Sequence, residues 1–385
     1  YMLHVITTPG VAFVTRRDGF DCGIMITASH NPFYDNGIKV LNSKGEKIGD
    51  DITLLIEAYL DGDLKKIGID EEDLPLARRE RTGKIVDHAA GRNRYVGYLI
   101  SLASHSYKDL KIGLDCANGA SWSIAKSVFD ALGAQTFVIG NTPDGLNVNK
   151  DCGSTHIENL QALVKEKNLD VGFAFDGDAD RCIAVDENGK VVDGDGILYV
   201  LGNRLKAKGT LDKNKIAVTV MSNTGLFRAL EDAGIGYEIT AVGDRFVYEK
   251  MEEEGLRLGG EQSGHIIIRK YATTGDGLLT AIMLTEELRD KKLTLSKLSE
   301  PVVLFPQITK NVRVTDKNAA INDEMLLKKC EEINAELGRN GRAVLRASGT
   351  EPVLRIMLEC ESKEKCEKYI STLYSIVKKR GYCCE

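Results

Sequence analysis

The sequence lacks the features that mark membrane-spanning, nucleic-acid-binding and zinc-binding proteins. No apolar run reaches the length of about 18 residues that a membrane helix needs. The formal net charge of -6 provides no bulk positive potential for a nucleic acid backbone. The nine cysteines are scattered, odd in number and free of the CxxC spacing of a structural zinc site. We therefore expect reduced thiols, a cytoplasmic location, and neither a membrane nor a nucleic acid as a partner.

The composition itself is that of a folded, globular protein. Hydrophobic residues make up 43% of the chain and charged residues 28%. A chain of 385 residues is too long for one ordinary hydrophobic core, so several domains are expected.

Over the first 300 residues, short apolar runs end at loops of small residues, and several of these loops lead into helical stretches. This alternation favours α/β domains. Apolar segments on both sides of Asn188-Gly189 also predict a β-hairpin. The expected strands of the first part are 23–26, 111–116, 170–175 and 216–221, and a helix is expected at 226–233.

From about residue 308 the pattern changes to that of a separate α+β domain, with a boundary near Glu300-Pro301. Gly338 is expected to end the first helix of this domain. The expected strands are 308–314, 342–347 and 353–360, with one helix carrying Leu326, Cys330, Ile333 and Leu337 and a last helix carrying Cys366, Ile370, Leu373 and Val377.

The strongest candidate metal site is Asp176-x-Asp178-x-Asp180, directly after the expected strand 170–175. Carboxylates at alternate positions can converge on one cation when the loop curls, and oxygen ligands suit Mg²⁺ or Ca²⁺. A calcium-binding EF-hand is a poor match, because Arg181 occupies the position that needs glycine. A solvated acidic turn is the alternative, but ligands of α/β proteins gather at the carboxyl ends of strands. The loop therefore favours metal-assisted phosphate chemistry.

A candidate nucleophile, Ser29, lies in Thr27-Ala28-Ser29-His30-Asn31-Pro32. In isolation this segment is typical of a turn, and the G-x-S-x-G signature of acyl transfer is absent. A serine that takes and returns a phosphoryl group needs a cation to spread the phosphate charge and an acid–base group nearby. Lys39 and His30 are the candidates for the acid–base group.

Two further loops carry groups suited to a sugar phosphate. Gly259-Gly260-Glu261-Gln262-Ser263-Gly264-His265 presents polar groups for a polyhydroxyl ligand, or is a polar β-turn. Arg346-Ala347-Ser348-Gly349-Thr350-Glu351-Pro352, with Arg355 beyond it, is typical of an anion site, although a solvated turn is the alternative. It has neither Walker nor Rossmann glycine spacing. Together the four loops favour an enzyme that moves phosphate between two positions of a sugar.

In chain order these four loops resemble the four active-site loops of the α-D-phosphohexomutases, and the resemblance covers essentially the whole chain. Within that family, Gln262, Asn36-Gly37-Ile38-Lys39 and Cys152-Gly153-Ser154-Thr155-His156 resemble the bacterial phosphoglucosamine mutase branch. The phosphomannomutase/phosphoglucomutase branch, which more often has Met at the position of Gln262, is the alternative.

The resemblance implies an α/β fold of three related α/β domains, each a mixed sheet sandwiched by helices, and a C-terminal α+β domain around a central cleft. The implied domains are 1–88 with the phosphoserine loop, 89–191 with the metal loop, 192–301 with the sugar-binding loop, and 302–385 with the phosphate-binding lid.

The resemblance also implies an activity. Phospho-Ser29 would convert glucosamine 6-phosphate into glucosamine 1-phosphate through a 1,6-bisphosphate, in amino sugar metabolism that supplies UDP-N-acetylglucosamine and peptidoglycan precursors. One Mg²⁺ per subunit, glucosamine 1,6-bisphosphate as intermediate or activator, a small sugar phosphate as partner, and a homodimer are expected. The implied site residues are Ser29, His30, Lys39, Arg181 and His265 for catalysis; Ser29, Asp176, Asp178 and Asp180 for the metal; Glu261 and Ser263 for the sugar; and Arg346, Ser348, Gly349, Thr350 and Arg355 for the non-reacting phosphate.

One departure from the family concerns the start of the chain. Family members carry a Gly-Thr-x-Gly-x-Arg-Gly segment well before the serine loop, whereas only 28 residues precede Ser29 here. We therefore expect an incomplete first domain. Two other classes of function are alternatives: a phosphatase of the haloacid dehalogenase type with Asp176 as nucleophile, which Asp180 disfavours because that family has Thr or Val there, and a sugar-phosphate-binding protein without catalysis.

Overall fold

The computed structural model describes residues 1–68, 77, 79–348 and 351–383. The chain forms two compact units. Unit 1 comprises Tyr1–Val220 and Tyr237–Ser299, and unit 2 comprises Met221–Gly236 and Glu300–Glu385. Among the described residues, no helix is both long and apolar enough to cross a membrane.

The first part of unit 1 is built on a two-stranded antiparallel sheet in which Met25 lies opposite Lys39. Thr7 caps the first helix by accepting a hydrogen bond from the Gly10 amide, and Pro9 lies in its first turn. The sequence predicts an incomplete first domain, and in the part of the chain that the structure describes the sheet of this domain consists of these two strands. The elements are α1 (Thr8–Asp18), β1 (Cys22–Ile26), β2 (Ile38–Asn42) and α2 (Asp50–Leu60).

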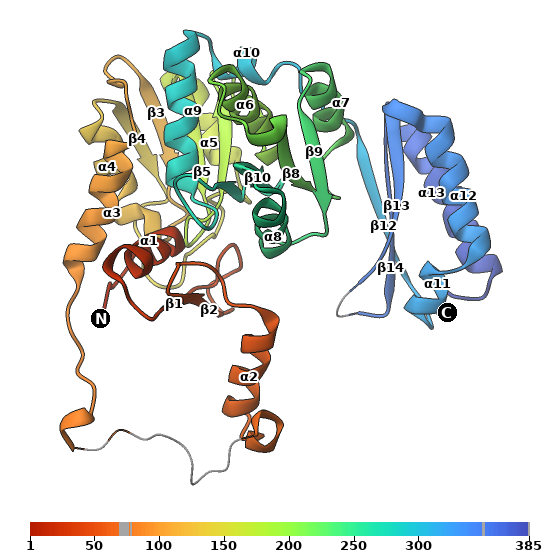
Figure 1. Ribbon diagram of the computed structural model, residues 1–385. Helices are drawn as coiled ribbons and strands as arrows, with labels where there is room; N and C mark the ends of the chain where they lie inside the picture. The colour runs from red at the N-terminus through yellow and green to blue at the C-terminus, as the bar shows by residue number, and fades with distance from the viewer. Residues whose placement is uncertain (69–76, 78, 349–350, 384–385) are drawn as a thin grey trace. The chain divides into compact units, whose positions relative to one another are not determined.

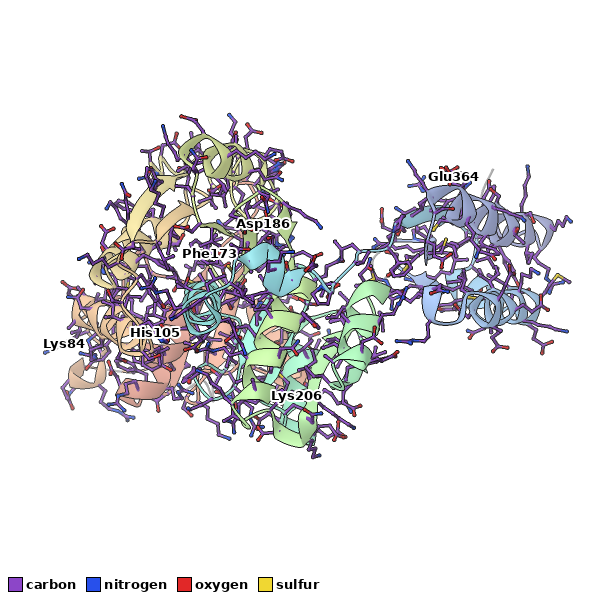
Figure 2. All side chains as sticks on the ribbon, turned by 90° about the horizontal axis from the view of Figure 1, so that it is seen from above. Lys84, His105, Phe173, Asp186, Lys206 and Glu364 are labelled. Carbon is purple, nitrogen blue, oxygen red and sulfur yellow. The ribbon has the colours of Figure 1, made fainter. Side chains whose placement is uncertain are left out.

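The second part of unit 1 is a five-stranded mixed sheet, which carries the metal loop. It contains α3 (Ala89–Ser101), β3 (Lys111–Asp115), α4 (Ala125–Ala131), β4 (Gln135–Ile139), α5 (Glu158–Lys167), β5 (Val171–Phe175), β6 (Cys182–Asp186) and β7 (Val191–Val192). The strand order is β4-β3-β5-β6-β7, with β3 parallel to both neighbours and β5, β6 and β7 successively antiparallel. The expected hairpin around Asn188-Gly189 is confirmed. Every residue of β5 and β6 is buried, and Figure 2 places Phe173 of β5 among the dense side chains of unit 1.

The third part of unit 1 is a four-stranded sheet of order β11-β10-β8-β9. It contains α6 (Gly194–Ala207), β8 (Lys215–Thr219), β9 (Gly236–Thr240), α8 (Asp244–Glu254), β10 (Leu258–Gly260), β11 (Ile266–Ile268), α9 (Gly277–Lys291) and α10 (Leu295–Ser299). Helix α9 contacts α6, α3 and β6, and Figure 1 shows α9 beside α6. Because α9 is packed against the two helices α3 and α6 and the strand β6, its first three turns are buried on all sides.

Unit 2 is an antiparallel sheet of order β12-β14-β13 with α12 and α13 on one side, as Figure 1 shows. The predicted three strands and two helices are confirmed, Gly338 follows the end of α12, and a short helix, α11, was not predicted. The elements are α7 (Thr224–Asp232), β12 (Gln307–Arg313), α11 (Lys317–Ile321), α12 (Glu324–Leu337), β13 (Gly341–Ala347), β14 (Val353–Cys360) and α13 (Lys363–Lys379). Short 3-10 turns in the two units are Leu64–Ile67, Arg79–Arg81, Ala120–Ser123, Asp212–Asn214 and Gly338–Asn340.

Helix α7 belongs to unit 2 because a buried carboxylate joins it to the C-terminal sheet. Glu359 on β14 is fully buried and accepts hydrogen bonds from the Thr224 amide and, at 3.1 Å, from Arg342 Nη2. Arg342 also donates to the carbonyl oxygen of Ser222. A buried charge needs such partners, so these bonds stabilise the placement of the segment before α7 against the C-terminal sheet.

Asp323 joins the start of α12 to the segment that follows α13. It is 4% exposed, caps α12 through the Met325 and Leu326 amides at 3.1 Å, and accepts bonds from Arg380 Nε at 2.7 Å and Tyr382 Oη at 3.0 Å. We expect Asp323→Ala to destabilise unit 2 by about 1–2 kcal/mol, since it removes a helix cap and the acceptor of the buried Leu326 amide. Asp323→Asn keeps an acceptor and should cost roughly half as much.

Hydrogen exchange of α12 and α13 measures this loss, with the fluorescence of Trp122, the single tryptophan, reporting on unit 1. Burial acts to raise the pKa of Asp323, but hydrogen bonds from Arg380, Leu326 and Tyr382 outweigh it and lower the pKa. A carboxyl group with a lowered pKa stabilises the folded state above its unfolded pKa of about 4 and loses that effect as the pH falls. The difference between wild type and Asp323→Asn should therefore shrink below about pH 4; a difference independent of pH would contradict the assignment.

Candidate active site

The serine loop follows β1 and holds Ser29 in the left-handed backbone region, with φ at 52°. The Ser29 amide donates to Thr27 Oγ1 at 2.8 Å, and the Asn31 amide donates to the Ala28 carbonyl at 2.9 Å, so the loop is a tight turn. Ser29 Oγ donates to Asp176 Oδ2 at 3.0 Å. The segment therefore forms the turn that its sequence is typical of, and Ser29 lies within hydrogen-bond distance of the metal loop.

The metal loop follows β5 and curls so that its three carboxylates converge. One oxygen each from Asp176, Asp178 and Asp180 lies within 4.8 Å of the others, and all three residues are buried. Ala179 has φ at 55°, and the Arg181 amide donates to Asp176 Oδ1 at 3.1 Å. The curled backbone therefore directs the side chains of Asp176, Asp178 and Asp180 toward the same region.

The donor set fits a hard divalent cation. Within the residues that the structure describes, Asp178 Oδ1 and Asp180 Oδ1 are buried and have no hydrogen-bond partner. Three buried carboxylates at this separation repel one another, and a cation bound to their oxygens would relieve both the repulsion and the missing bonds. The buried triad can therefore bind a metal ion.

Protonation in this cluster is uneven. Burial and the charges of Asp180 and Asp178 raise the pKa of Asp176 well above its usual value. Burial acts in the same direction on Asp180, but the interactions of Asp180 with His265 and Lys39 outweigh burial and hold its pKa well below that value. The pKa values of closely spaced carboxyl groups commonly move apart in this way, and groups with perturbed pKa values cluster at functional sites.

Lys39 projects from β2 to the same carboxylates. Its Nζ lies 2.5 Å from Asp178 Oδ2 and 2.8 Å from Asp180 Oδ2. Burial acts to lower the pKa of Lys39, but these two carboxylates raise it far above 10.5. Burial also lowers the pKa of His30, with Arg181 adding to the effect. Lys39 is thus a protonated group at neutral pH, and His30 a neutral one.

The loop between β10 and β11 brings His265 to the metal loop. His265 is 2% exposed, with Nδ1 at 3.5 Å from Asp180 Oδ1, and its Nε2 accepts a bond from the Gly275 amide at 2.9 Å. Glu261 Oε1 accepts a bond from the Gly243 amide at 3.0 Å, and Ser263 is exposed on the same turn.

The predicted anion cradle lies in unit 2. Arg346 on β13 and Arg355 on β14 are directly opposite each other, so their side chains share one face of the sheet. Two like charges at such a position are unfavourable unless an anion lies between them. Ser348, 3% exposed, directly follows the last residue of β13, and Lys317 Nζ donates to its carbonyl at 2.8 Å. Gly349 and Thr350, also predicted for this cradle, lie outside the described residues.

Two residues at the serine and metal loops were not predicted. Thr8, at the start of α1, donates through its hydroxyl and its amide to Asp178. Asn149, in the connection from β4 to α5, donates to the serine loop. Thr7-Thr8-Pro9 carries a helix-start signal that could have located Thr8 at the start of a helix. No local pattern indicates that Thr8 contacts Asp178 or that Asn149 contacts the serine loop.

Four family models match the chain in the order of the loops. They are the phosphoglucomutase/phosphomannomutase alpha/beta/alpha domains I, II and III, at residues 1–66, 93–189 and 193–304, and the C-terminal domain of the same family at residues 310–374.

Curated relatives match over nearly the whole chain. A phosphoglucosamine mutase of Lachnospira eligens is 56% identical over 99% of this chain and 83% of that protein. A phosphoglucosamine mutase of Lachnoclostridium phytofermentans is 51% identical over 99% of this chain and 84% of that protein.

A solved structure shows a similar fold. N-acetylphosphoglucosamine mutase of Aspergillus fumigatus, in complex with GlcNAc-6P and magnesium, has a TM-score of 0.75 and 18% identity, over 97% of this chain and 92% of that one. The likeness at this identity concerns the fold alone. The domain models and the curated relatives show that this chain belongs to the phosphoglucomutase/phosphomannomutase family, the phosphohexomutases, which are isomerases.

Proposed function

We propose that the protein is a cytoplasmic phosphoglucosamine mutase, which interconverts glucosamine 6-phosphate and glucosamine 1-phosphate. The observation that carries this proposal is the 3.0 Å hydrogen bond between Ser29 Oγ and Asp176 Oδ2, at the edge of three converging buried carboxylates. A hydroxyl nucleophile beside a cation site is the arrangement that phosphoryl transfer needs. The relatives at 56% and 51% identity bear the name of this activity.

In the proposed reaction the enzyme starts with a phosphoryl group on Ser29. The bond from phosphorus to Ser29 Oγ breaks while phosphorus bonds to O1 of glucosamine 6-phosphate, which yields the 1,6-bisphosphate. Ser29 Oγ then attacks the 6-phosphate, which regenerates the phosphoserine and releases glucosamine 1-phosphate. Over the cycle O1 loses one proton and O6 gains one, so the enzyme returns to its starting state.

The proposed roles follow from charge and position. Neutral His30 would accept the proton of the attacking hydroxyl, and protonated Lys39 would stabilise or protonate the leaving oxygen. Arg181, next to the metal loop, would neutralise phosphate charge. His265 would hold Asp180 in place through its buried ring. Ser29, Asp176, Asp178 and Asp180 would hold one Mg²⁺, which supplies electrostatic stabilisation of the phosphate oxygens when bound.

The phosphate that does not react needs a separate anion site. The opposed pair Arg346 and Arg355, with Ser348 beside it, supports this role because bidentate arginine contacts suit phosphate. Glu261 and Ser263 would contact the sugar. Gln262, which suggested the branch of the family, donates instead to Asp193 Oδ2 at 3.1 Å, and Asp193 caps α6. The proposed contribution of Gln262 is thus to the shape of the loop that presents Glu261.

Relative rates on different sugars test the substrate. We expect kcat/KM for glucosamine 6-phosphate to exceed that for glucose 6-phosphate and mannose 6-phosphate by at least about tenfold, because the ammonium group of the amino sugar can form a charge-assisted bond with Glu261. Glu261→Gln should lower kcat/KM more for the amino sugar than for glucose 6-phosphate. Equal or faster turnover of the neutral sugars by the wild type would reject the glucosamine assignment in favour of the phosphomannomutase/phosphoglucomutase branch.

A further inference from the structure

A single buried amide side chain reaches the serine loop from the connection between β4 and α5. Asn149 is 6% exposed, and its Nδ2 donates to the carbonyl oxygens of Ser29 and Asn31, both at 2.8 Å. The amide nitrogen carries two hydrogens, so these two bonds use its full donor capacity. Asn149 and the serine loop lie 120 positions apart in the sequence.

The bond to the Ser29 carbonyl acts on the backbone of the nucleophile itself. A left-handed conformation costs an ordinary L-residue roughly 1–2 kcal/mol, so Ser29 keeps it only when its surroundings favour it. The Ser29 carbonyl accepts a second bond from the Gly177 amide at 3.1 Å. One donor therefore comes from the metal loop and the other from Asn149, and together they determine where the Ser29 peptide points.

Asn149 is itself held rigidly. Its backbone is left-handed, with φ at 57°, a conformation that asparagine tolerates better than most residues. The Asn149 amide donates to the Ala117 carbonyl at 2.9 Å, directly after β3. A side chain on a fixed backbone can orient its partner, because little rotational freedom is left to absorb a shift.

We propose that Asn149 is a positioning residue for the nucleophile. By holding the Ser29 carbonyl oxygen, its side chain keeps Ser29 Oγ directed at Asp176. This inference rests on the proposed mutase function. Phosphoryl transfer depends on the alignment of the attacking oxygen, phosphorus and the leaving oxygen, so loss of the bonds should slow the chemical step rather than substrate binding.

Asn149→Gly is the informative variant, because glycine retains the left-handed backbone and removes only the amide. Asn149→Asp keeps the volume but replaces both donors by a carboxylate facing two carbonyl oxygens. We expect kcat to fall by about tenfold to a hundredfold in both variants, with KM within about twofold of wild type. Phosphate transfer to Ser29 from glucosamine 1,6-bisphosphate, followed by intact-protein mass, should slow by the same factor.

Asn168→Gly is the matched control. Asn168 is also left-handed, with φ at 50°, but it is exposed at the end of α5, so its replacement should leave kcat unchanged. If Asn149→Gly is too unstable to assay, kcat and KM of Asn149→Asp are compared with those of the wild type instead. If Ser29 of the wild type acquires phosphate and an Asn149 variant acquires it equally fast, the positioning role alone is overturned. A variant with a raised KM and an unchanged kcat would overturn it as well. A wild type that never acquires phosphate would overturn the proposed function and this role with it.

Discussion

Replacing Ser29 with alanine should lower mutase turnover by at least about a thousandfold and abolish the phosphorylated form of the protein. The expected effect is this large because the hydroxyl would carry the transferred group, and among the described residues Ser29 is the hydroxyl that donates to Asp176. The alanine variant should remain folded, since the hydrogen bond that Ser29 Oγ donates goes to the metal loop and not to the hydrophobic core. Turnover of glucosamine 6-phosphate and intact-protein mass after incubation with glucosamine 1,6-bisphosphate measure the two outcomes.

Ser101→Ala provides the control for this experiment. Ser101 is exposed at the end of α3, where its hydroxyl bonds only the Tyr98 carbonyl at 2.7 Å, so turnover and phosphate content should stay at wild-type values. A Ser29→Ala protein that still gains one phosphoryl group, on an aspartate, would contradict the mutase and support a phosphatase with Asp176 as nucleophile. A wild type that binds sugar phosphate without turnover would support a binding protein instead.

Replacing Asp178 with asparagine should lower turnover by about a hundredfold to a thousandfold and weaken Mg²⁺ binding at least tenfold. Asp178 is fully buried, its Oδ1 has no partner among the described residues, and its Oδ2 contacts Lys39 and Thr8. The amide keeps the shape and one oxygen but removes the negative charge that a hard cation requires. Chelation of divalent cations from the wild type should stop turnover, and added Mg²⁺ should restore it.

Asp186→Asn is the matched control for the metal site. Asp186 is also a buried aspartate at the end of a strand, 1% exposed, but its Oδ1 accepts bonds from the Asn188 and Lys190 amides of the hairpin. Its replacement should leave the Mg²⁺ dependence of the rate unchanged. Binding of Mg²⁺ measured by titration calorimetry separates the two variants from a general loss of stability. Equal Mg²⁺ affinity in Asp178→Asn and wild type would contradict the assignment of the triad as the metal site.

Local patterns were sufficient to locate most of the fold and the loops of the site. The apolar run 170–175 and the helix-spaced residues Leu326, Cys330, Ile333 and Leu337 became a buried strand and a buried helix face. The metal loop was located because it directly follows an apolar strand, and Ser29 was singled out only in combination with the three other loops. Strand β2 and its pairing with β1 were not predicted, because the pairing of strands is decided by residues distant in the sequence.

By itself the sequence determined which residue types stand at the ends of which strands, and so the chemistry available: a hydroxyl at position 29, three carboxylates after β5, and two arginines on neighbouring strands. These features depend on periodicity and on adjacent residues. Only the tertiary structure decided that Lys39 meets Asp178 and Asp180, and that Asn149 donates to Ser29. Contacts between residues more than a hundred positions apart depend on strand register, helix placement and left-handed turns, which no short stretch of sequence determines.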